Sequence, residues 1–399
     1  MKKIVFLMFL LLLSSLLIVS CGDNTSKTTS STLPESTVSP VKTSSDTLWA
    51  TLPSAVSTPS PVTTKPIVVT APMSTDMKTT VPVTTKTPIS ETEPQVTTVL
   101  QTTPGTTIPE TTVPETSAAP ITYTAKSWMG ALPDATFLNN IAIPGTHDSG
   151  ATKDMILAGT AKCQSLSIAE QLAVGVRFFD IRLRRVDGEL HVYHGYVDQE
   201  LTFDEVLSAC YTFLAENPSE ALIMCIKEEY DASGTNSAFD AMVAAKIKEN
   251  AAYWHTTPAV PTLGAVRGKI VLMRRYSTSG SFGINASSGW RDNTTFTLNT
   301  GSATLSVQDY YNNESADAKW AAVTAMFQKM QYKKNTYYLN YTSGYKAGTF
   351  DIPNINTIKD SVNPKLIEYL KTSPDFVGTV VVDFVTDEIA QLIYEVNFR

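Results

Sequence analysis

The sequence predicts one α/β domain, a parallel (βα) barrel, that follows a long segment without a core. From about residue 123, apolar runs of strand length alternate with segments of helical periodicity. Repeated strand–helix units within a single domain of this size favour a barrel. A doubly wound open sheet is the alternative, but no Gly-rich phosphate loop follows the first predicted strand.

Composition excludes several classes of protein. The chain has 399 residues and a formal net charge of −7, with no basic run after Lys2–Lys3, so we expect no nucleic-acid partner. The cysteines include no CxxC pair, so we expect no structural zinc site. They are Cys21, Cys163, Cys210 and Cys225. The sequence leaves the oligomeric state open, and we expect a monomer.

The N-terminus has the pattern of an export signal. Lys2–Lys3 precede an apolar run over 4–19, which is typical of a signal peptide. The sequence IVSCG at 18–22 resembles a bacterial lipoprotein signal, in which residues 1–20 are removed and Cys21 is lipidated. An uncleaved membrane anchor is the alternative, although the run is short for a membrane span. Both interpretations place the rest of the chain outside the cytoplasm.

Residues 21–122 are predicted to be a disordered Thr/Pro/Ser-rich linker. They hold most of the 22 prolines of the chain and one aromatic residue, Trp49, so they cannot bury a core. Such a segment acts as a stalk or spacer. The globular domain is therefore expected over 123–399.

The first predicted strand is the apolar run 141–143, which Pro144–Gly145 are expected to break. The sequence THDS follows directly. A His147–Asp148 pair after a strand suggests a titratable group aimed into a cleft, because histidine suits proton transfer near neutrality. The alternative is a helix N-terminus capped by Asp148 or Ser149.

Two capping boxes mark helix starts, one formed by Ser167 and Glu170 and the other by Thr202 and Glu205. The second opens a helix that runs to about Glu216. Its apolar face is built from Phe203, Val206, Leu207, Cys210, Phe213 and Leu214.

The remaining elements follow from the same periodicities. Further strands are expected at 177–185, 190–194, 221–230, 269–276, 304–311, 336–342 and 378–384. Helices are expected to open at 167–171 and to span 240–249, 316–330, 364–371 and 387–396.

Charged residues recur late in these strands. In a parallel barrel the carboxyl ends of the strands meet at one face, where active sites lie. The residues concerned are Asp180 and Arg182, His194, Lys227 and Glu229, Arg275, Asp309 with Tyr311, and Asp383. Each has an ordinary alternative as a surface residue, a simple ion pair or a loop cap. Because buried charges are costly unless paired, the set together favours one shared site.

The residue types in this set define a chemistry. His147 and His194 can act as general base and general acid, and Arg182 can hold a phosphoryl group. Carboxylates can orient the histidines and tune their pKa values. The candidates are Asp148, Asp180 and Asp383. Two histidines and an arginine, without a cluster of metal-binding carboxylates, suit phosphodiester cleavage by an internal hydroxyl.

The sequence resembles the bacterial phosphatidylinositol-specific phospholipase C family. The resemblance is carried by IAIPGTHDSGA, GVRFFDIRLR, ELHVYHG, NPSEALIMCIKEEY, GKIVLMRRYS, LSVQDYY and VVVDF, which occur in the order of the family across nearly all of 123–399. It implies an irregular, incompletely closed TIM-like (βα) barrel. It also implies cleavage of phosphatidylinositol to diacylglycerol and inositol 1,2-cyclic phosphate.

The resemblance also implies roles for individual residues. His147 matches the base that takes the proton of the inositol 2-hydroxyl, His194 matches the acid that protonates the diacylglycerol oxygen, and Arg182 matches the phosphate-binding arginine. The matching supporting carboxylates are Asp148, Asp180 and Asp383. Residues that match inositol-binding positions, or lie beside them, are Lys227, Glu229, Arg275, Asp309 and Tyr311.

Calcium-dependent relatives carry a metal-binding carboxylate where Arg182 stands, so the resemblance implies an enzyme that needs no metal and no cofactor. The implied partner is phosphatidylinositol or a GPI-type lipid at a membrane surface. Candidates for an apolar docking rim are the segment 155–157 and Tyr345. With lipidated Cys21, the enzyme is expected on the outer surface of a bacterium. The alternatives are another barrel glycerophosphodiesterase, which needs metal, and a non-catalytic inositol- or glycan-binding protein.

Overall fold

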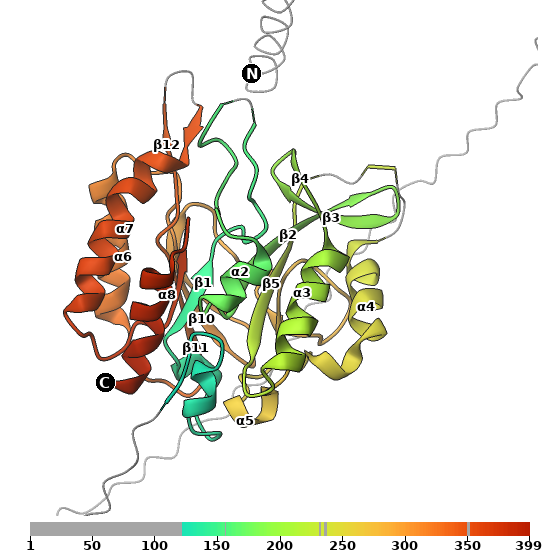
Figure 1. Cartoon of the computed structure of the whole chain (residues 1–399). Helices are drawn as coiled ribbons and strands as arrows, with labels where there is room; N and C mark the ends of the chain where they lie inside the picture. The colour runs from blue at the N-terminus through green and yellow to red at the C-terminus, as the bar shows by residue number, and fades with distance from the viewer. Residues whose placement is uncertain (1–121, 156, 231–232, 235–237, 349–351) are drawn as a thin grey trace, which may run out of the picture. The chain divides into compact units, whose positions relative to one another are not determined.

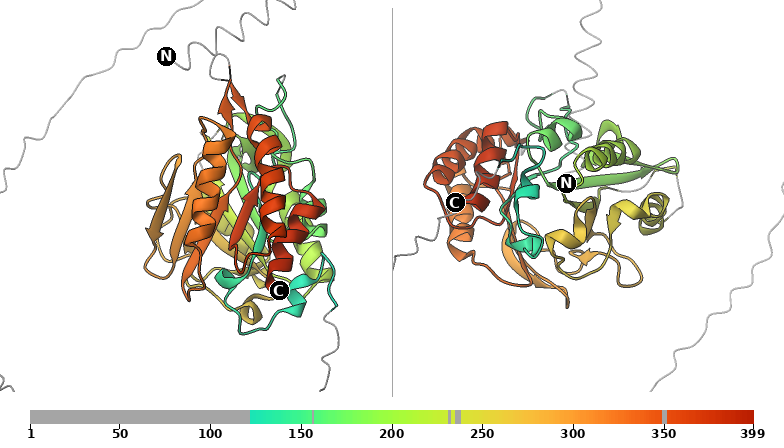
Figure 2. Two further views of the ribbon diagram at one scale, coloured as in Figure 1. Left: turned by 90° about the vertical axis from the view of Figure 1, so that its left-hand side faces the viewer. Right: turned by 60° about the horizontal axis from the view of Figure 1, so that its bottom comes forward.

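A strongly curved sheet with helices on its outer side forms the part of the chain that the computed structural model describes (Figures 1 and 2). The described residues are 122–155, 157–230, 233–234, 238–348 and 352–399. The predicted signal peptide, Cys21 and the predicted linker up to residue 121 lie outside them. No helix in these described ranges is both long and apolar enough to cross a membrane.

The sheet has the strand order β6-β7-β5-β2-β1-β14-β11-β10-β9. Its strands are β1 (Ile143–Thr146), β2 (Phe178–Val186), β3 (Glu189–His194), β4 (Val197–Thr202), β5 (Leu222–Glu228), β6 (Trp254–His255), β7 (Ile270–Arg275), β8 (Ile284–Asn285), β9 (Thr294–Asn299), β10 (Thr304–Asp309), β11 (Thr336–Tyr341) and β14 (Thr379–Val382). The path from β6 to β10 is parallel throughout, and β9 pairs antiparallel with β10.

Further strand pairings lie at the rim. β3 and β4 form an antiparallel extension of β2, and β8 pairs with β7. The short strands β12 (Lys346–Ala347) and β13 (Pro353–Asn354) pair with each other. Within the described ranges, no pairing joins the β6–β8 edge to β9, so the barrel stays open there. The prediction of an incompletely closed α/β barrel is confirmed.

The helices cover the outer face of the sheet, as Figure 2 shows. They are α2 (Ile168–Ala173), α3 (Phe203–Glu216), α4 (Phe239–Glu249), α5 (Leu263–Val266), α6 (Ala316–Lys329), α7 (Ile355–Lys371) and α8 (Asp387–Tyr394). Short 3₁₀ helices lie at Trp128–Ala131, Leu138–Asn140, Ala251–Tyr253 and Glu395–Phe398. Both predicted capping boxes are present, at the starts of α2 and α3.

Side-chain alternation along the strands separates two cores. On β2, Phe179, Ile181 and Leu183 point outward and pack with the helices. Cys225 of β5 and Val381 of β14 point inward and help to fill the barrel. The same alternation turns polar residues inward at the carboxyl ends of the strands, which places the candidate site there.

The prediction for the first strand was wrong in its position. β1 includes Pro144–Gly145 instead of ending before them. The Pro144 carbonyl accepts a hydrogen bond of 2.9 Å from the Arg177 amide, and Arg177 precedes β2. The Pro144 nitrogen points to the same side as this carbonyl, so it lies opposite a part of the chain that comes before β2. The missing N–H therefore costs no ladder bond. A Cβ on Gly145 would lie 3.0 Å from the Phe178 ring, so the close strand packing favours glycine.

The prediction for the helix at 364–371 was also wrong in its start. α7 begins at Ile355 and includes Pro364. One buried face continues through the proline, and its residues are Ile355, Ile358, Val362, Leu366 and Leu370. Proline inside a helix costs about 3 kcal/mol. Burial of five large apolar side chains, at about 1.5–3 kcal/mol each, exceeds that cost.

A buried ion pair at the amino ends of the strands gives the first testable prediction. Arg177 and Glu220 are both fully buried, with 2.8 Å between Arg177 Nη2 and Glu220 Oε2, and Glu220 also accepts from the Met129 and Gly130 amides. Removing one partner leaves the other charge buried and unpaired, so Glu220→Ala should lower the free energy of unfolding by about 3–5 kcal/mol. Urea denaturation measures this loss.

The matched control is the more exposed pair between Arg267 and Asp134, whose carboxylate side chain is 75% exposed. Asp134→Ala should lower the free energy of unfolding by at most about 1 kcal/mol. Equal losses for Glu220→Ala and Asp134→Ala would show that the buried pair is not the stabilising element we describe.

Candidate active site

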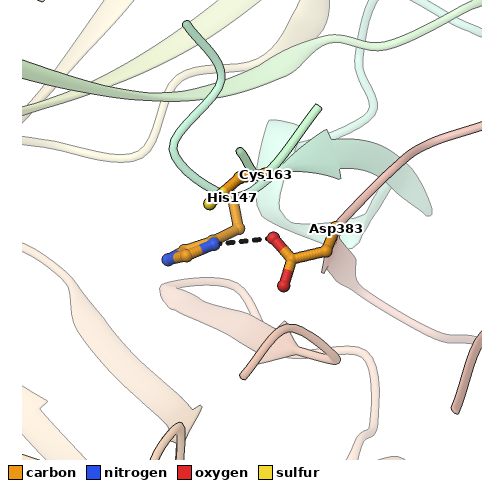
Figure 3. Close-up of side chains that lie close together, drawn as sticks. All are labelled: His147, Cys163 and Asp383. Carbon is orange, nitrogen blue, oxygen red and sulfur yellow. Dashed lines mark hydrogen bonds and ion pairs between the residues drawn. The ribbon is translucent and has the colours of Figure 1, made fainter. Parts of the chain in front are cut away.

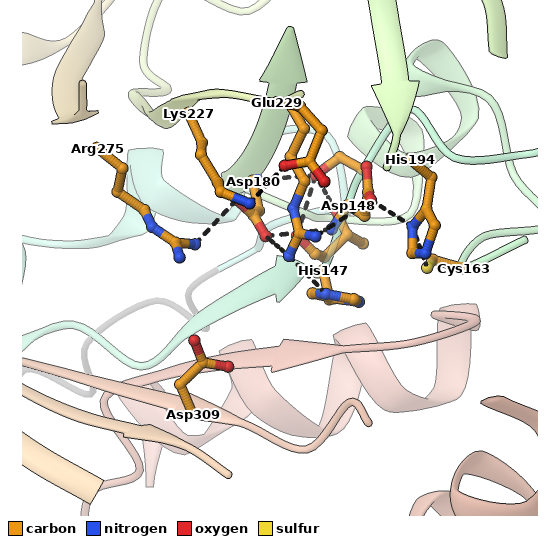
Figure 4. A network of polar contacts seen from close by, with 12 residues as sticks. His147, Asp148, Cys163, Asp180, His194, Lys227, Glu229, Arg275 and Asp309 are labelled. Carbon is orange, nitrogen blue, oxygen red and sulfur yellow. Dashed lines mark hydrogen bonds and ion pairs between the residues drawn. The ribbon is translucent and has the colours of Figure 1, made fainter. Parts of the chain in front are cut away.

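The candidate site lies where the parallel strands end. His147 follows β1 and Asp383 follows β14, two strands that pair directly. Asp180 and Arg182 lie on β2, next to β1 on its other side. Figure 4 shows the resulting network of histidines, carboxylates and cations around the barrel mouth.

His147 is held between a carboxylate and a guanidinium. Its Nδ1 lies 2.8 Å from Asp383 Oδ1, and its Nε2 lies 2.7 Å from Arg182 Nη2 (Figure 3 shows the first contact). Arginine can only donate, so these partners assign the ring hydrogen to Nδ1 and a lone pair to Nε2. Burial lowers the pKa of His147, Asp383 raises it and Arg182 lowers it, and the balance leaves this pKa above its ordinary value.

Gln164 ties the two strand ends that carry this pair. It is fully buried, and its Nε2 donates to the carbonyls of His147 and Val382 at 2.8 and 2.9 Å. The Gly344 amide donates to Asp383 Oδ2 at 3.2 Å. The carboxylate and the ring are thus fixed from several sides. Sequence reasoning missed Gln164, because it lies in a loop outside any motif.

Asp148 links Arg182 to the second histidine. Its Oδ2 lies 2.6 Å from His194 Nδ1 and 3.5 Å from Arg182 Nη1. Arg182 also donates to Asp180 Oδ2 at 3.1 Å. Burial raises the pKa of Asp180, but Arg182 and Arg275 lower it by more, and the net result is a pKa of about 2. Asp180 is therefore a carboxylate at neutral pH, and it holds the guanidinium beside both histidines.

The turn after β1 is not a helix cap, so that alternative interpretation was wrong. The next helix, α2, begins at Ile168 and is capped by Ser167. Asp148 instead has φ of 41°, in the left-handed region. Ser149 holds the turn, because its Oγ accepts a 2.9 Å bond from the Asp180 amide. A strained aspartate fixed in this way points its carboxylate at His194.

Lys227, near the end of β5, and Glu229, directly after β5, form an ion pair at the mouth. The Gly195 amide, directly after His194, donates to Glu229 Oε1 at 3.0 Å. Burial raises the pKa of Glu229, while Arg182 and Lys227 lower it to about 2. Burial lowers the pKa of Lys227. The pair adds one fixed positive and one fixed negative group beside Arg182.

Arg275 and Asp309 lie on the strands next to the open edges, and Trp290 joins them. The Arg275 guanidinium lies 3.8 Å from the centroid of a Trp290 ring, and Trp290 Nε1 donates to Asp309 Oδ2 at 3.0 Å. Arg275 Nη1 lies 3.7 Å from Asp180 Oδ1. Sequence reasoning missed Trp290, which lies in the connection between β8 and β9 without a local motif.

Tyr341 is a third residue that sequence reasoning missed. Its ring lies 6.2 Å from His147, edge to face. Tyr341 points into the barrel with Leu339, and an inward aromatic residue on a strand is no signal for a site. The alternation of β11 could have placed it in the lining, but not beside the histidine.

Tyr311 is the predicted site residue that the network does not include. β10 ends at Asp309, and Tyr311 donates to an Asp292 carboxylate oxygen instead. Its ring lies 6.0 Å from that of Tyr345, one of the candidates for the docking rim. In the other candidate segment, Met155 is 37% and Leu157 is 46% exposed, while residue 156 lies outside the described ranges.

Among the residues that the structure describes, two groups of side chains bring metal-binding atom types within 4.8 Å of one another, and both include Cys163. They are His147, Cys163 and Asp383, and Asp148, Cys163 and His194. Burial raises the pKa of Cys163 well above its ordinary value, and Asp383 and Asp148 raise it further. In each group the histidine Nδ1 already bonds the carboxylate, and Arg182 places positive charge beside both pairs. These donors do not fit a resident metal ion.

Several buried polar atoms at the mouth have no hydrogen-bond partner within the described ranges. They are Asp148 Oδ1, Asp180 Oδ1, Arg182 Nε, Arg275 Nη1 and the Tyr341 hydroxyl. Buried polar groups are normally satisfied, so this convergence indicates a site for a polar ligand. Arg182 and Arg275 supply positive charge for an anion, and the carboxylates supply acceptors for hydroxyl groups.

An open (βα) barrel with two histidine–carboxylate pairs and arginines at its mouth defines a barrel enzyme with acid–base groups. A family model described as phosphatidylinositol-specific phospholipase C, X domain, matches residues 138–276. The chain is 32% identical over 276 residues to the 1-phosphatidylinositol phosphodiesterase of Staphylococcus aureus, covering 65% of this chain and 88% of that protein. It is also 32% identical over 230 residues to the Listeria monocytogenes enzyme of the same name, covering 55% and 68%.

Solved structures agree with the sequence relatives. A phosphatidylinositol-specific phospholipase C structure from S. aureus, concerned with modulation of its membrane binding, matches with a TM-score of 0.62 and 30% identity. The match covers 68% of this chain and 97% of that chain. The chain therefore belongs to the bacterial phosphatidylinositol-specific phospholipase C family.

Proposed function

We propose that the chain cleaves phosphatidylinositol, or glycosylated derivatives of it, by attack of the inositol 2-hydroxyl on the phosphodiester. The observation that supports this most is the position of Arg182, which donates to His147 Nε2 and lies beside Asp148, the partner of His194. A phosphate bound to this guanidinium would therefore have a base on one side and an acid on the other.

The reaction balances with these groups alone. His147 Nε2 takes the proton of the 2-hydroxyl, and the oxygen forms a bond to phosphorus. The bond from phosphorus to the diacylglycerol oxygen breaks, and protonated His194 supplies a proton to that oxygen. The products are diacylglycerol and inositol 1,2-cyclic phosphate. Arg182 offsets the charge that grows on the phosphoryl oxygens, so the step needs no metal.

The other charged groups are assigned to the inositol ring. Lys227, Glu229, Arg275 and Asp309 surround the mouth with donors and acceptors that suit a ring of hydroxyl groups. Tyr311 lies further out, beside Tyr345, and is assigned to the rim of this pocket. The roles of Asp383 and Asp148 are to orient and stabilise the protonated forms of His147 and His194.

The proposal is tested by following diacylglycerol release from vesicles that contain phosphatidylinositol, with phosphatidylcholine vesicles as control, in EDTA. We expect release from the first only. Activity that EDTA abolishes and metal restores would indicate the alternative of a metal-dependent barrel phosphodiesterase. Binding of inositol lipid without cleavage would indicate the non-catalytic alternative.

The raised pKa of His147 gives a pH prediction. The base form of His147 is lost as pH falls through its folded pKa, so the acidic limb of kcat/KM should lie above pH 6.5, the ordinary value for histidine. Asp383 raises this pKa, so Asp383→Asn should move the NMR titration midpoint of His147 to lower pH. Glu189→Gln, beside the more exposed His191, should leave it unchanged. An unmoved His147 midpoint in Asp383→Asn would contradict the assignment.

We further propose that Cys21 is lipidated after removal of residues 1–20, and that residues 21–122 carry the catalytic domain, 123–399, on the outer surface of a bacterium. A flexible chain of about 100 residues has an end-to-end distance of roughly 50–60 Å. That distance would let the barrel reach a lipid surface other than its own membrane.

Cys21→Ser tests this anchoring. We expect the variant to leave the membrane fraction while its specific activity on short-chain soluble substrate is unchanged, because the substitution lies far from the site in sequence. Fractionation followed by immunoblotting measures the distribution. Retention in the membrane as firm as that of the parent would support the uncleaved apolar anchor instead.

A further inference from the structure

A buried lysine lies behind the wall of the barrel mouth and has no part in the proposed chemistry. Lys319 is 0% exposed and lies in the first turns of α6, whose N-cap is Ser315. Burial removes the hydration of an ammonium group, and a helix N-terminus carries partial positive charge, so both features disfavour a cation here. In the described part of the chain, the hydrogen bonds of its Nζ go to neutral oxygens and not to a carboxylate. Lys319 can therefore act through those two hydrogen bonds and not through an ion pair.

The two acceptors flank a candidate substrate-binding residue. Lys319 Nζ donates to Gln308 Oε1 at 3.1 Å and to the Tyr310 carbonyl at 2.7 Å. Asp309 lies between these two residues. Because side chains alternate along β10, Gln308 points back toward α6 while Asp309 points into the barrel. Lys319 thus holds the chain on both sides of one carboxylate.

Gln308 extends this network to the next strand. Its Nε2 donates to Asn340 Oδ1 at 2.9 Å and to the Tyr341 carbonyl at 2.6 Å, and its Oε1 also accepts from the Tyr310 amide at 2.9 Å. The carboxyl ends of β10 and β11 are therefore joined behind the barrel wall. In front of that wall lie Asp309 and the Tyr341 ring.

Asp309 is also held from inside the barrel mouth. Trp290 donates to its Oδ2 at 3.0 Å, and Figure 4 shows Asp309 across the mouth from the Asp180 cluster. Burial lowers the pKa of Lys319 to about 7, against the opposing effects of Asp309 and Asp383. A neutral amine keeps two N–H groups, which matches its two acceptors. The contacts therefore do not require the charge.

We propose that Lys319 is a positioning residue for substrate binding, which fixes the end of β10 so that the Asp309 carboxylate faces the inositol ring. This inference rests on the proposed function, because it takes Asp309 as an inositol ligand. The contacts that hold His147, Asp383 and Arg182 do not involve Lys319. Its removal should weaken binding much more than it slows the acid–base step.

The test uses the full chain and the variant Lys319→Met, which keeps the length of the side chain and cannot donate. We expect the Kd for myo-inositol, measured by calorimetry, and the KM for phosphatidylinositol to rise about tenfold, with kcat within about threefold of the parent. Val323→Ala, on the same helix and also fully buried, is the matched control. It should lower stability and leave Kd and KM unchanged.

A double-mutant cycle separates positioning from a general structural role. In the Asp309→Asn background, Lys319→Met should change the Kd for myo-inositol less than twofold. If the full tenfold effect persists in that background, Lys319 does not act through Asp309 and the proposal is overturned. If Lys319→Met does not fold, Gln308→Leu removes the same bond from the other side and should give the same shift in Kd.

Failure of this inference is distinguishable from failure of the proposed function. A parent chain that neither binds myo-inositol nor cleaves phosphatidylinositol overturns the proposed function. A parent that does both, with a Lys319→Met variant of equal Kd and KM, overturns only the role of Lys319.

Discussion

His147→Ala and His194→Ala should each lower kcat/KM on phosphatidylinositol by about 10²–10⁴, the usual contribution of a general acid or base. The reason is geometric. His147 Nε2 carries the ring lone pair and accepts from Arg182, and His194 is held by Asp148, which also lies beside that guanidinium. Initial rates of diacylglycerol release measure the loss, and circular dichroism checks that each variant folds.

The control for this pair is His191→Ala, on the same strand as His194. His191 pairs with Glu189, which is 72% exposed, and lies outside the network of the site. It should keep activity within about twofold. A large loss for one of the two proposed catalytic histidines and almost none for the other would refute their assignment as base and acid.

Arg182→Lys should lower kcat by about 10²–10³. This is the usual effect of removing one hydrogen-bond donor to the charge that develops in a transition state. The guanidinium contacts His147, Asp180 and Asp148 at once, through two of its nitrogens. An ammonium lacks that planar fork and cannot keep all three contacts while also holding a phosphate. Steady-state kinetics in EDTA measure the effect.

Arg185→Lys is the matched control, three residues further along β2, where Arg185 pairs with Glu228 near the surface. It should leave kcat unchanged. Full activity of Arg182→Lys would contradict the proposed role of the guanidinium. Recovery of Arg182→Lys by calcium alone would show that the site works through a metal after all.

The arrangement of the site was predictable where it follows from strand alternation. Asp180 and Arg182 share the inward face of β2, opposite Phe179, Ile181 and Leu183, as their spacing required. The strand ends then bring His147 and Asp383 together, although 236 residues separate them, because β1 and β14 pair in parallel. Local periodicity and the topology of a barrel suffice for this part.

Residues that act through loops or from behind the sheet left no such signal. Gln164 and Trp290 lie in connections, and their contacts depend on where those loops cross the barrel mouth. Lys319 has the sequence context of an ordinary surface lysine on a helix, and only the packing of α6 buries it. In the same way, pairing and packing overrode local propensity at Pro144 and Pro364.

In the proposed reaction the inositol 2-hydroxyl is the nucleophile and no metal takes part. Phosphorus NMR during turnover of phosphatidylinositol in detergent micelles and EDTA distinguishes this nucleophile from water. We expect the resonance of inositol 1,2-cyclic phosphate to appear first, with inositol 1-phosphate following only slowly. Inositol 1-phosphate as the first product, without a cyclic precursor, would contradict the account, because water would then be the nucleophile.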